Sequence, residues 1–381
     1  MDRKEIGELR RRFRPEKSAV SRIYGCYVNG SSRQIVSYLD ESLGNMPQEE
    51  AEKYLSLLRK ALSGSLGKNL IDVVFSTQQV ADSDEHRLLS ALRESELKDG
   101  EIREGFYRTV IDALDLEGGN YIILLAHDAY DVPHRDKSGE VDGHDQVFSY
   151  IVCAVCPVKA CRMELGYFPG ENEFHSCAAG QIVSAPELGF LFPAFDDRAA
   201  NLYNALFYTR KADAIHQEFI DAVFRTEPPM SAAEQKEAFE GALRASLEEA
   251  CSLEVVQAVH GRLLEKIEAH KEAGGQERLA LSVEEVGGIL RECGVPEERA
   301  EAFQARCGEA FAGAALDPEN LIDVKRFDVK TEQATISIDP AYSYLVETRI
   351  IDGRKYLLVP AGEGVEVNGL SVELEAGGPE A

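Results

Sequence analysis

Two apolar segments of strand length constrain the fold more than any other feature of this sequence. They span Tyr121–Ala126 and Val147–Val155, and each is rich in β-branched and aromatic residues. Segments of this length and composition indicate buried strands. Further strands are predicted at 163–168, 181–184 and 189–192, which together indicate a mixed or antiparallel sheet. We therefore expect an α+β fold in which helices flank a sheet core.

Helical and strand periodicities divide the chain into four predicted parts. Capping boxes at Ser231–Glu234 and Ser282–Glu285 open helices, and the spacing of Leu202 and Leu206 predicts another helix from residue 199 onward. The C-terminal part returns to a period of two, with a hairpin turn at Asp352–Gly353. The predicted parts are a basic N-terminal helix (1–19), an α+β core (20–210), an acidic helical module (211–320) and a C-terminal β segment with a short tail (321–381).

The charge balance restricts the classes of partner. The chain has 67 acidic and 41 basic residues, and the formal net charge of -26 opposes nonspecific attraction to nucleic acid or to an anionic membrane. The first residues are charged where a secretory leader is apolar, and no apolar run approaches the length of a membrane span. We therefore expect a cytoplasmic protein that does not bind membranes, whose eight cysteines are reduced thiols.

Positive charge is concentrated at the N-terminus. Residues 1–22 carry eight basic and four acidic side chains, and the strip formed by Arg10, Arg11, Arg12 and Arg14 is the candidate partner-binding site. A protein partner is expected, and DNA is an alternative that general electrostatics does not favour. The alternatives are that the strip pairs with the acidic surface of this same chain or is a solvated helix face.

The segment from His127 to Asp145 concentrates histidine and aspartate directly after the first apolar segment. Imidazole and carboxylate are the ligands of manganese, iron or zinc in hydrolases. The candidate ligands are His127, Asp131 and His134, and Asp196 or Asp197 would act as the base. The alternatives are an ordinary polar loop at 127–145 and a helix entry at Asp196–Asp197.

Other motifs lack parts that their chemistry requires. Gly64–Asn69 lacks the first glycine and the magnesium-binding hydroxyl of a phosphate loop, so no nucleotide cofactor is predicted. Cys153 and Cys156 could hold zinc, but a strand directs residues three apart to opposite faces, which favours buried thiols. A divalent metal bound by the histidine–aspartate segment is the cofactor alternative.

Several motifs along the chain resemble an uncharacterised bacterial family known as domain of unknown function 4317. These are Gly25–Val28, Leu62–Leu70, Leu124–Asp128, Tyr130–Pro133, Phe190–Arg198 and Ile350–Tyr356. The resemblance covers essentially the whole chain and implies no activity. From about Gly189 onward, the order of the parts is also similar to bacterial nucleoid-associated proteins, which would imply an acidic, non-enzymatic protein that binds DNA or a DNA-handling partner.

Two functional hypotheses follow from the sequence. The first is a non-enzymatic cytoplasmic binding or scaffold protein, with nucleoid association as one form of it, because no motif for a nucleotide or a nucleophile is complete. The second is a metal-dependent hydrolase of the phosphoesterase kind that uses the segment 127–145. The sequence leaves open whether copies of the chain associate with one another.

Overall fold

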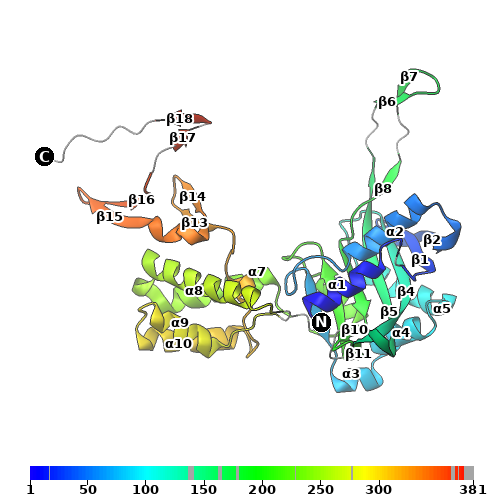
Figure 1. The fold of residues 1–381 in the computed structure, drawn as a ribbon, viewed down its shortest axis with the longest axis horizontal. Helices are drawn as coiled ribbons and strands as arrows, with labels where there is room; N and C mark the ends of the chain where they lie inside the picture. Colours follow the sequence, from blue (N-terminus) through cyan, green and yellow to red (C-terminus); the bar gives the residue numbers. More distant parts are fainter. Residues whose placement is uncertain are drawn as a thin grey trace. The chain divides into compact units, whose positions relative to one another are not determined.

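The computed structural model describes most of the chain. The described residues are 1–16, 18–135, 141–161, 165–176, 180–227, 229–275, 278–361, 365–367 and 369–372, and the side chains of 134, 135 and 141–146 are not among the described parts. The chain divides into two compact units, Met1–Glu234 with Gln276–Arg278, and Gln235–Gly275 with Leu279–Ala381 (Figure 1). The four-part division drawn from the sequence stays a prediction.

An eight-stranded antiparallel sheet forms the centre of the first unit. Its order is β2-β1-β4-β5-β9-β12-β3, and β8 adds to the end of β5. The predicted α+β class is confirmed. The strands are β1 (Arg22–Asn29), β2 (Gln34–Ser42), β3 (Leu70–Val74), β4 (Tyr121–Arg135), β5 (Val141–Ala160), β8 (Gln181–Val183), β9 (Leu188–Phe192) and β12 (Asn204–Thr209).

Both faces of the central strands of this sheet are buried. Along β5, Cys153 and Val155 belong to one apolar core, whereas Ala154 and Cys156 belong to the other, and all four side chains are fully buried. This division follows from the alternation of side chains along a strand. The interpretation of Cys153 and Cys156 as buried thiols on opposite faces is confirmed.

Helices cover the two faces of the sheet (Figure 1). One face packs against α1 (Arg3–Arg12) and α2 (Gln48–Lys60). The other packs against α4 (Asp84–Glu94), α5 (Gly100–Ala113) and α6 (Gln217–Val223), which supply leucine and aromatic side chains to the second core. The first unit also contains α3 (Thr77–Asp82) and the two small hairpins β6–β7 (Leu165–Phe168, Glu173–Ser176) and β10–β11 (Ala194–Asp196, Ala199–Asn201).

The histidine–aspartate segment is not a loop over its described length, so that alternative was wrong there. His127 to Arg135 continue β4, and pairing with β5 runs from Tyr121↔Pro157 through Asp131↔Val147 to Arg135↔Val141. Backbone hydrogen bonds hold such a ladder irrespective of side-chain polarity, so polar composition did not mark the end of the strand. Residues 136–140 lie outside the described part.

The helix predicted from residue 199 was also wrong. Residues 199–201 and 204–209 form β11 and β12, and the helix that follows, α6, begins only at Gln217. Leu202 lies in the turn before β12 and packs against one core, whereas Leu206 lies in β12 and belongs to the other, so their spacing of four does not mark a shared face. Asp196–Asp197 therefore does not enter a helix: Asp197 and Arg198 have φ values of 49° and 62° and form the turn between β10 and β11.

The second unit consists of helices and small hairpins. The predicted capping boxes at Ser231–Glu234 and Ser282–Glu285 are present at the starts of α7 and α9. The predicted turn at Asp352–Gly353 joins β15 to β16, and both residues have a positive φ. The elements are α7 (Ala232–Leu247), α8 (Leu253–Glu272), α9 (Val283–Glu292), α10 (Glu297–Ala310), α11 (Pro318–Leu321), β13 (Phe327–Lys330), β14 (Thr335–Ile338), β15 (Glu347–Ile351), β16 (Arg354–Leu358), β17 (Val365–Val367) and β18 (Leu370–Val372).

No helix in the described ranges has both the length and the apolar character needed to cross a bilayer.

Replacing Gly25 by alanine tests the close packing of the central strands. A Cβ atom at Gly25 in β1 would collide with the carbonyl oxygen of Ile123 in the neighbouring β4. We expect Gly25→Ala to lower the free energy of unfolding by about 1–3 kcal/mol, measured by urea unfolding with circular dichroism. In contrast, Gly105→Ala in α5, where a Cβ meets nothing within 4 Å, should be neutral or stabilising. Equal effects of the two substitutions would contradict this account.

Candidate functional site: a basic pocket between two helix ends

The first helix is fixed on the sheet by its apolar side. Asp2 caps α1 through a capping box with Glu5. Ile6, Leu9 and Phe13 are buried in the core that α1 shares with β5. Because these residues lie three and four apart, they form one apolar side of the helix, and Arg10 and Arg11 lie exposed away from that core.

A buried ion pair adds a polar anchor. Asp128 of β4 is 2% exposed, and its carboxylate accepts hydrogen bonds from Arg12 Nε at 2.5 Å, Arg12 Nη2 at 2.8 Å and Tyr150 Oη at 2.6 Å. The guanidinium also lies over the ring of Tyr130, 4.5 Å from its centroid. Burial lowers the pKa of Arg12, but the hydrogen bond and the charge of Asp128 outweigh it and raise that pKa above its ordinary value. Arg12 is therefore engaged inside the protein.

A second polar contact lies beside the first. Glu8 accepts hydrogen bonds from Tyr130 Oη and from Arg198 Nη1, the latter at 3.0 Å. Burial raises the pKa of Glu8, but these two hydrogen bonds dominate and lower the pKa below its ordinary value. The inward polar residues of α1 thus all have partners on the first unit.

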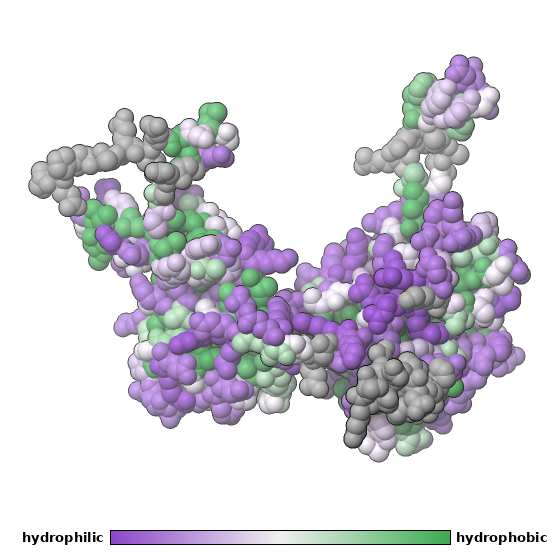
Figure 2. All heavy atoms as spheres, viewed as in Figure 1, coloured by the Kyte–Doolittle hydropathy of each residue, from purple (hydrophilic) through white to green (hydrophobic). Residues whose placement is uncertain are grey.

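The outward residues of α1 form a basic pocket with the end of α2. A cavity of about 490 Å³ is lined by Gly7, Arg10, Arg11, Arg14, Arg59, Lys60 and Ser63. The described residues that line it include five cationic side chains and no carboxylate. Figure 2 shows the surface around α1 as strongly hydrophilic. We call this cavity the basic pocket.

The cations of the basic pocket have few competing partners. Arg10, Arg11, Arg14, Arg59 and Lys60 form no ion pair with any residue that the structure describes. Arg11 comes close enough to Glu8 to contribute to the lowered pKa of that carboxyl, which is already held by Tyr130 and Arg198. The last turns of α1 and α2 carry partial negative charge, which compensates part of the repulsion among the cations. The remaining positive potential suits an oxyanion, because guanidinium groups pair with carboxylate and phosphate.

The predicted metal ligands are spread along a strand. His127 is half-buried, and its Nε2 lies 2.9 Å from Ser149 Oγ, while burial lowers the pKa of the imidazole. Asp131 is exposed, four residues farther along β4, which separates the two Cα atoms by about 13 Å in an extended chain. The side chain of His134 lies outside the described part. No described cluster of three or more histidine, cysteine, aspartate or glutamate residues could hold an ion, and the metal site stays a prediction.

The candidate bases lie on the β10–β11 hairpin. Asp196 accepts hydrogen bonds from the side-chain amides of Asn201 at 2.8 Å and Asn204 at 3.4 Å. It also contacts the amino group of Met1. Asp197 occupies the adjacent turn. These contacts give Asp196 a structural role at the hairpin, and its role as a base stays a prediction.

Sequence reasoning found only part of the basic pocket. Arg10, Arg11 and Arg14 line it as one group, whereas Arg12 points to Asp128. Arg59 and Lys60, which stand in the last turn of α2, were missed. Their meeting with α1 depends on how both helices pack on the sheet, which no local pattern encodes.

The Arg12–Asp128 pair is expected to contribute far more stability than a surface pair. Arg12→Met leaves a buried carboxylate without its cation, which costs about 3–5 kcal/mol. The matched control is Arg22→Met, because Arg22 and Asp40 form an ion pair with both side chains about half exposed, and its loss should leave the free energy of unfolding nearly unchanged. Urea unfolding of both variants measures the difference, and similar losses would contradict the anchoring role of Arg12.

Comparison with known proteins gives the family but no activity. No curated protein matches the chain. The family described as domain of unknown function DUF4317 matches residues 1–370, a range that includes the first unit, most of the second and every residue of the basic pocket. With nearly the whole length matched, the chain belongs to the DUF4317 family.

Proposed function

We propose that this protein is a non-enzymatic binding protein that holds an anionic partner in the basic pocket. The observation that carries the proposal is the gathering of five cations, with no carboxylate among the lining residues, on a chain with a net charge of -26. Like charges held together without counter-charges destabilise a fold unless a ligand or solvent compensates them. A bound anion would supply the counter-charge that the five cations lack.

The partner that fits best is a short acidic segment of another protein. The cavity of about 490 Å³ has room for a few oxyanion groups. A long polyanion such as duplex DNA would extend beyond it, over a protein whose net charge is strongly negative. Exposed charges interact over about 8–10 Å at physiological salt, so a short segment can contact the pocket while avoiding most of the repulsion. Nucleoid association would then come through a DNA-handling protein.

A charge reversal of the pocket should abolish capture of an acidic peptide. The variant Arg10→Glu/Arg11→Glu/Arg14→Glu replaces the three N-terminal arginines of the pocket and leaves Arg12 in place. Fluorescence anisotropy with a labelled oligoglutamate peptide should show saturable binding to the unmodified protein that weakens as salt is raised. The triple variant should show a loss of affinity of at least about tenfold, since two or more charge-assisted contacts are removed.

The matched control carries the same change in net charge elsewhere. Arg306, Arg354 and Lys355 are exposed residues of the second unit, and their joint replacement by glutamate should leave peptide binding nearly unchanged. An equal loss of peptide affinity in both triple variants would show that the overall charge of the protein, and not the pocket, governs binding. If labelled duplex DNA binds more tightly than the peptide, and only the pocket variant loses this binding, the partner of the pocket is nucleic acid and not an acidic protein segment.

The metal-dependent hydrolase is the competing hypothesis, and metal analysis separates the two. If the protein is a binding protein, material purified without a histidine tag should contain transition metal well below one equivalent, as measured by inductively coupled plasma mass spectrometry. His127→Ala should leave that content unchanged, because the described contact of His127 is with Ser149. A stoichiometric metal that disappears in His127→Ala or His134→Ala would support the hydrolase instead.

A further inference from the structure

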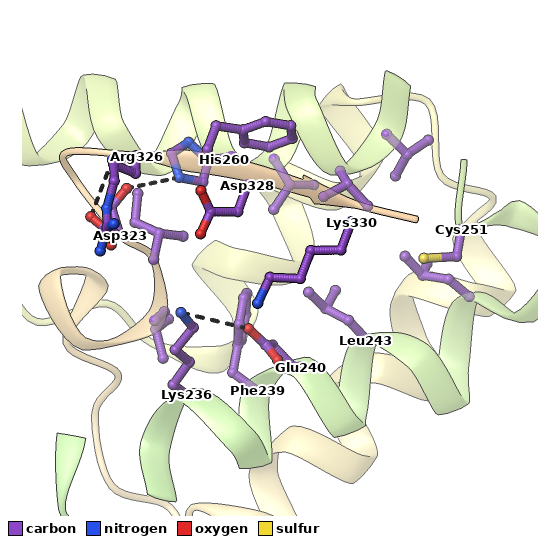
Figure 3. Close-up of a pocket in the computed structure, with 17 residues that line it drawn as sticks. Lys236, Phe239, Glu240, Leu243, Cys251, His260, Asp323, Arg326, Asp328 and Lys330 are labelled. Atoms are coloured by element: carbon purple, nitrogen blue, oxygen red, sulfur yellow. Dashed lines mark hydrogen bonds and ion pairs between the residues drawn. The ribbon is translucent and has the colours of Figure 1, made fainter. Parts of the chain in front are cut away.

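The centre of the second unit carries charges of both signs that compensate one another. A cavity of about 390 Å³ lies between α7, α8 and the segment that leads into β13 (Figure 3). Three cations and three carboxylates line it, so the cavity selects no ligand by its charge. These residues are Lys236, Arg326, Lys330, Glu240, Asp323 and Asp328. A different feature of this unit calls for a partner, the open edge of a strand.

The β15–β16 hairpin stands largely in solvent. Every residue of β15 is exposed, and the side chains of Ile350 and Ile351 are 71% and 44% exposed. Figure 2 shows apolar surface along this hairpin. A two-stranded hairpin alone is only marginally stable in water, and three or more strands with an apolar face are needed for independent stability. A further strand beside the hairpin would therefore stabilise it.

The base of the hairpin is fixed to α8. Gln257 of α8 donates hydrogen bonds to the backbone carbonyls of Ser343 at 2.6 Å and of Val346 at 3.0 Å. Thr348 Oγ1 donates a hydrogen bond to Glu254 of the same helix at 3.1 Å. These contacts hold the start of β15 in a defined position, so its edge is presented to a partner in one orientation.

One edge of β15 is open. Among the strands that the structure describes, β15 pairs with β16 alone. The two-residue turn at Asp352–Gly353 makes Ile351 and Arg354 a hydrogen-bonded pair. Because the direction of the backbone groups alternates along an antiparallel strand, those of Ile350 and Thr348 point away from β16. Such an edge is a template for another strand.

The edge of β15 lacks the protection that β2 has at the edge of the large sheet. A bulge interrupts the pairing of β2 with β1, and Asp40 and Glu41 place two negative charges on β2. Bulges and charges of this kind discourage pairing with another chain. The register of β15 with β16 is regular, and its two charged residues, Glu347 and Arg349, have opposite signs.

The sequence around β15 is complementary to itself in an antiparallel arrangement. When Thr348 lies opposite Thr348 of a second copy, Glu347 of each copy lies opposite Arg349 of the other. A twofold axis at Ile350 would instead place Arg349 opposite Ile351, so the charges pair only in the register centred on Thr348. That register also places apolar residues opposite one another, Ile350 with Val346 and Ile351 with Leu345.

The local charge permits copies to meet at this edge. The chain has a net charge of -26, so two copies repel each other over most of their surface. Within one chain, however, Arg349 and Glu347 form an ion pair at 3.0 Å, and the charges of β15 cancel. Contact between two such edges adds no repulsion between like charges.

We propose that β15 pairs with β15 of a second copy of this chain, antiparallel about a twofold axis at Thr348. The two hairpins then form one four-stranded sheet in the order β16–β15–β15–β16, which exceeds the number of strands that stability requires. Each copy supplies the same strand to the contact, so association closes at a dimer. This surface is separate from the basic pocket, whose residues all belong to the first unit.

Sedimentation velocity of the whole chain at several concentrations tests the proposal. We expect a reversible equilibrium between monomer and dimer. Arg349→Glu and Glu347→Arg each place like charges opposite one another, so each should weaken the dimer by at least about tenfold. The exchanged variant Glu347→Arg/Arg349→Glu restores opposite charges and should form dimers like the unmodified protein.

A mixture of the two single variants tests the register. Chains with Arg349→Glu and chains with Glu347→Arg complement each other in the register centred on Thr348, so the mixture should form a heterodimer although neither variant pairs with itself. The matched control is Arg306→Glu, which makes the same charge change at an exposed position of α10 and should leave the dimer unchanged. Circular dichroism confirms that each variant is folded. A monomer at every concentration, equal weakening by Arg306→Glu, or a mixture without heterodimer would each overturn the proposal.

Discussion

The fold of the first unit depends on burying both faces of one antiparallel sheet. Strands β4, β5 and β9 carry fully buried side chains on alternating faces, so each face needs its own cover of helices. α1 and α2 meet this need on one side, and their C-terminal ends converge there. Four of the five cations that line the basic pocket stand in those last turns, and Arg14 follows the end of α1. A requirement of hydrophobic burial thereby brings together charges that are distant in sequence.

The buried centre could be predicted well because a strand buried on both faces appears in the sequence as a continuous run of apolar residues. The apolar segments Tyr121–Ala126 and Val147–Val155 became the adjacent strands β4 and β5, and the capping boxes appear where serine and glutamate stand three apart. The prediction failed where a short spacing was taken for a helical face. Leu202 lies in a turn and Leu206 in β12, on opposite cores, and the pairing of β12 with β3 and β9 fixes the strand.

The candidate site was harder to predict because its contacts are long-range. Arg12 and Arg11 are neighbours in a run of similar residues, yet one is bound to a buried carboxylate 116 positions away and the other lines a cavity. The rotation of α1 about its own axis decides that Arg12 faces the sheet and Arg11 faces the cavity. The buried side chains of Ile6, Leu9 and Phe13 fix that rotation. A charge count can locate such a strip, but only the packing identifies which of its residues face solvent.

The buried thiols on the central sheet have a consequence for studying this family. Burial raises the pKa of Cys26 and Cys156 to about 12 and that of Cys153 well above its ordinary value, so few thiolates form while the core stays closed. Cys153 and Cys156 lie on opposite sides of the same strand. The rates at which the two thiols are alkylated therefore report how often the helices on each face of the sheet separate from it. The native chain thus contains one probe of local opening for each face.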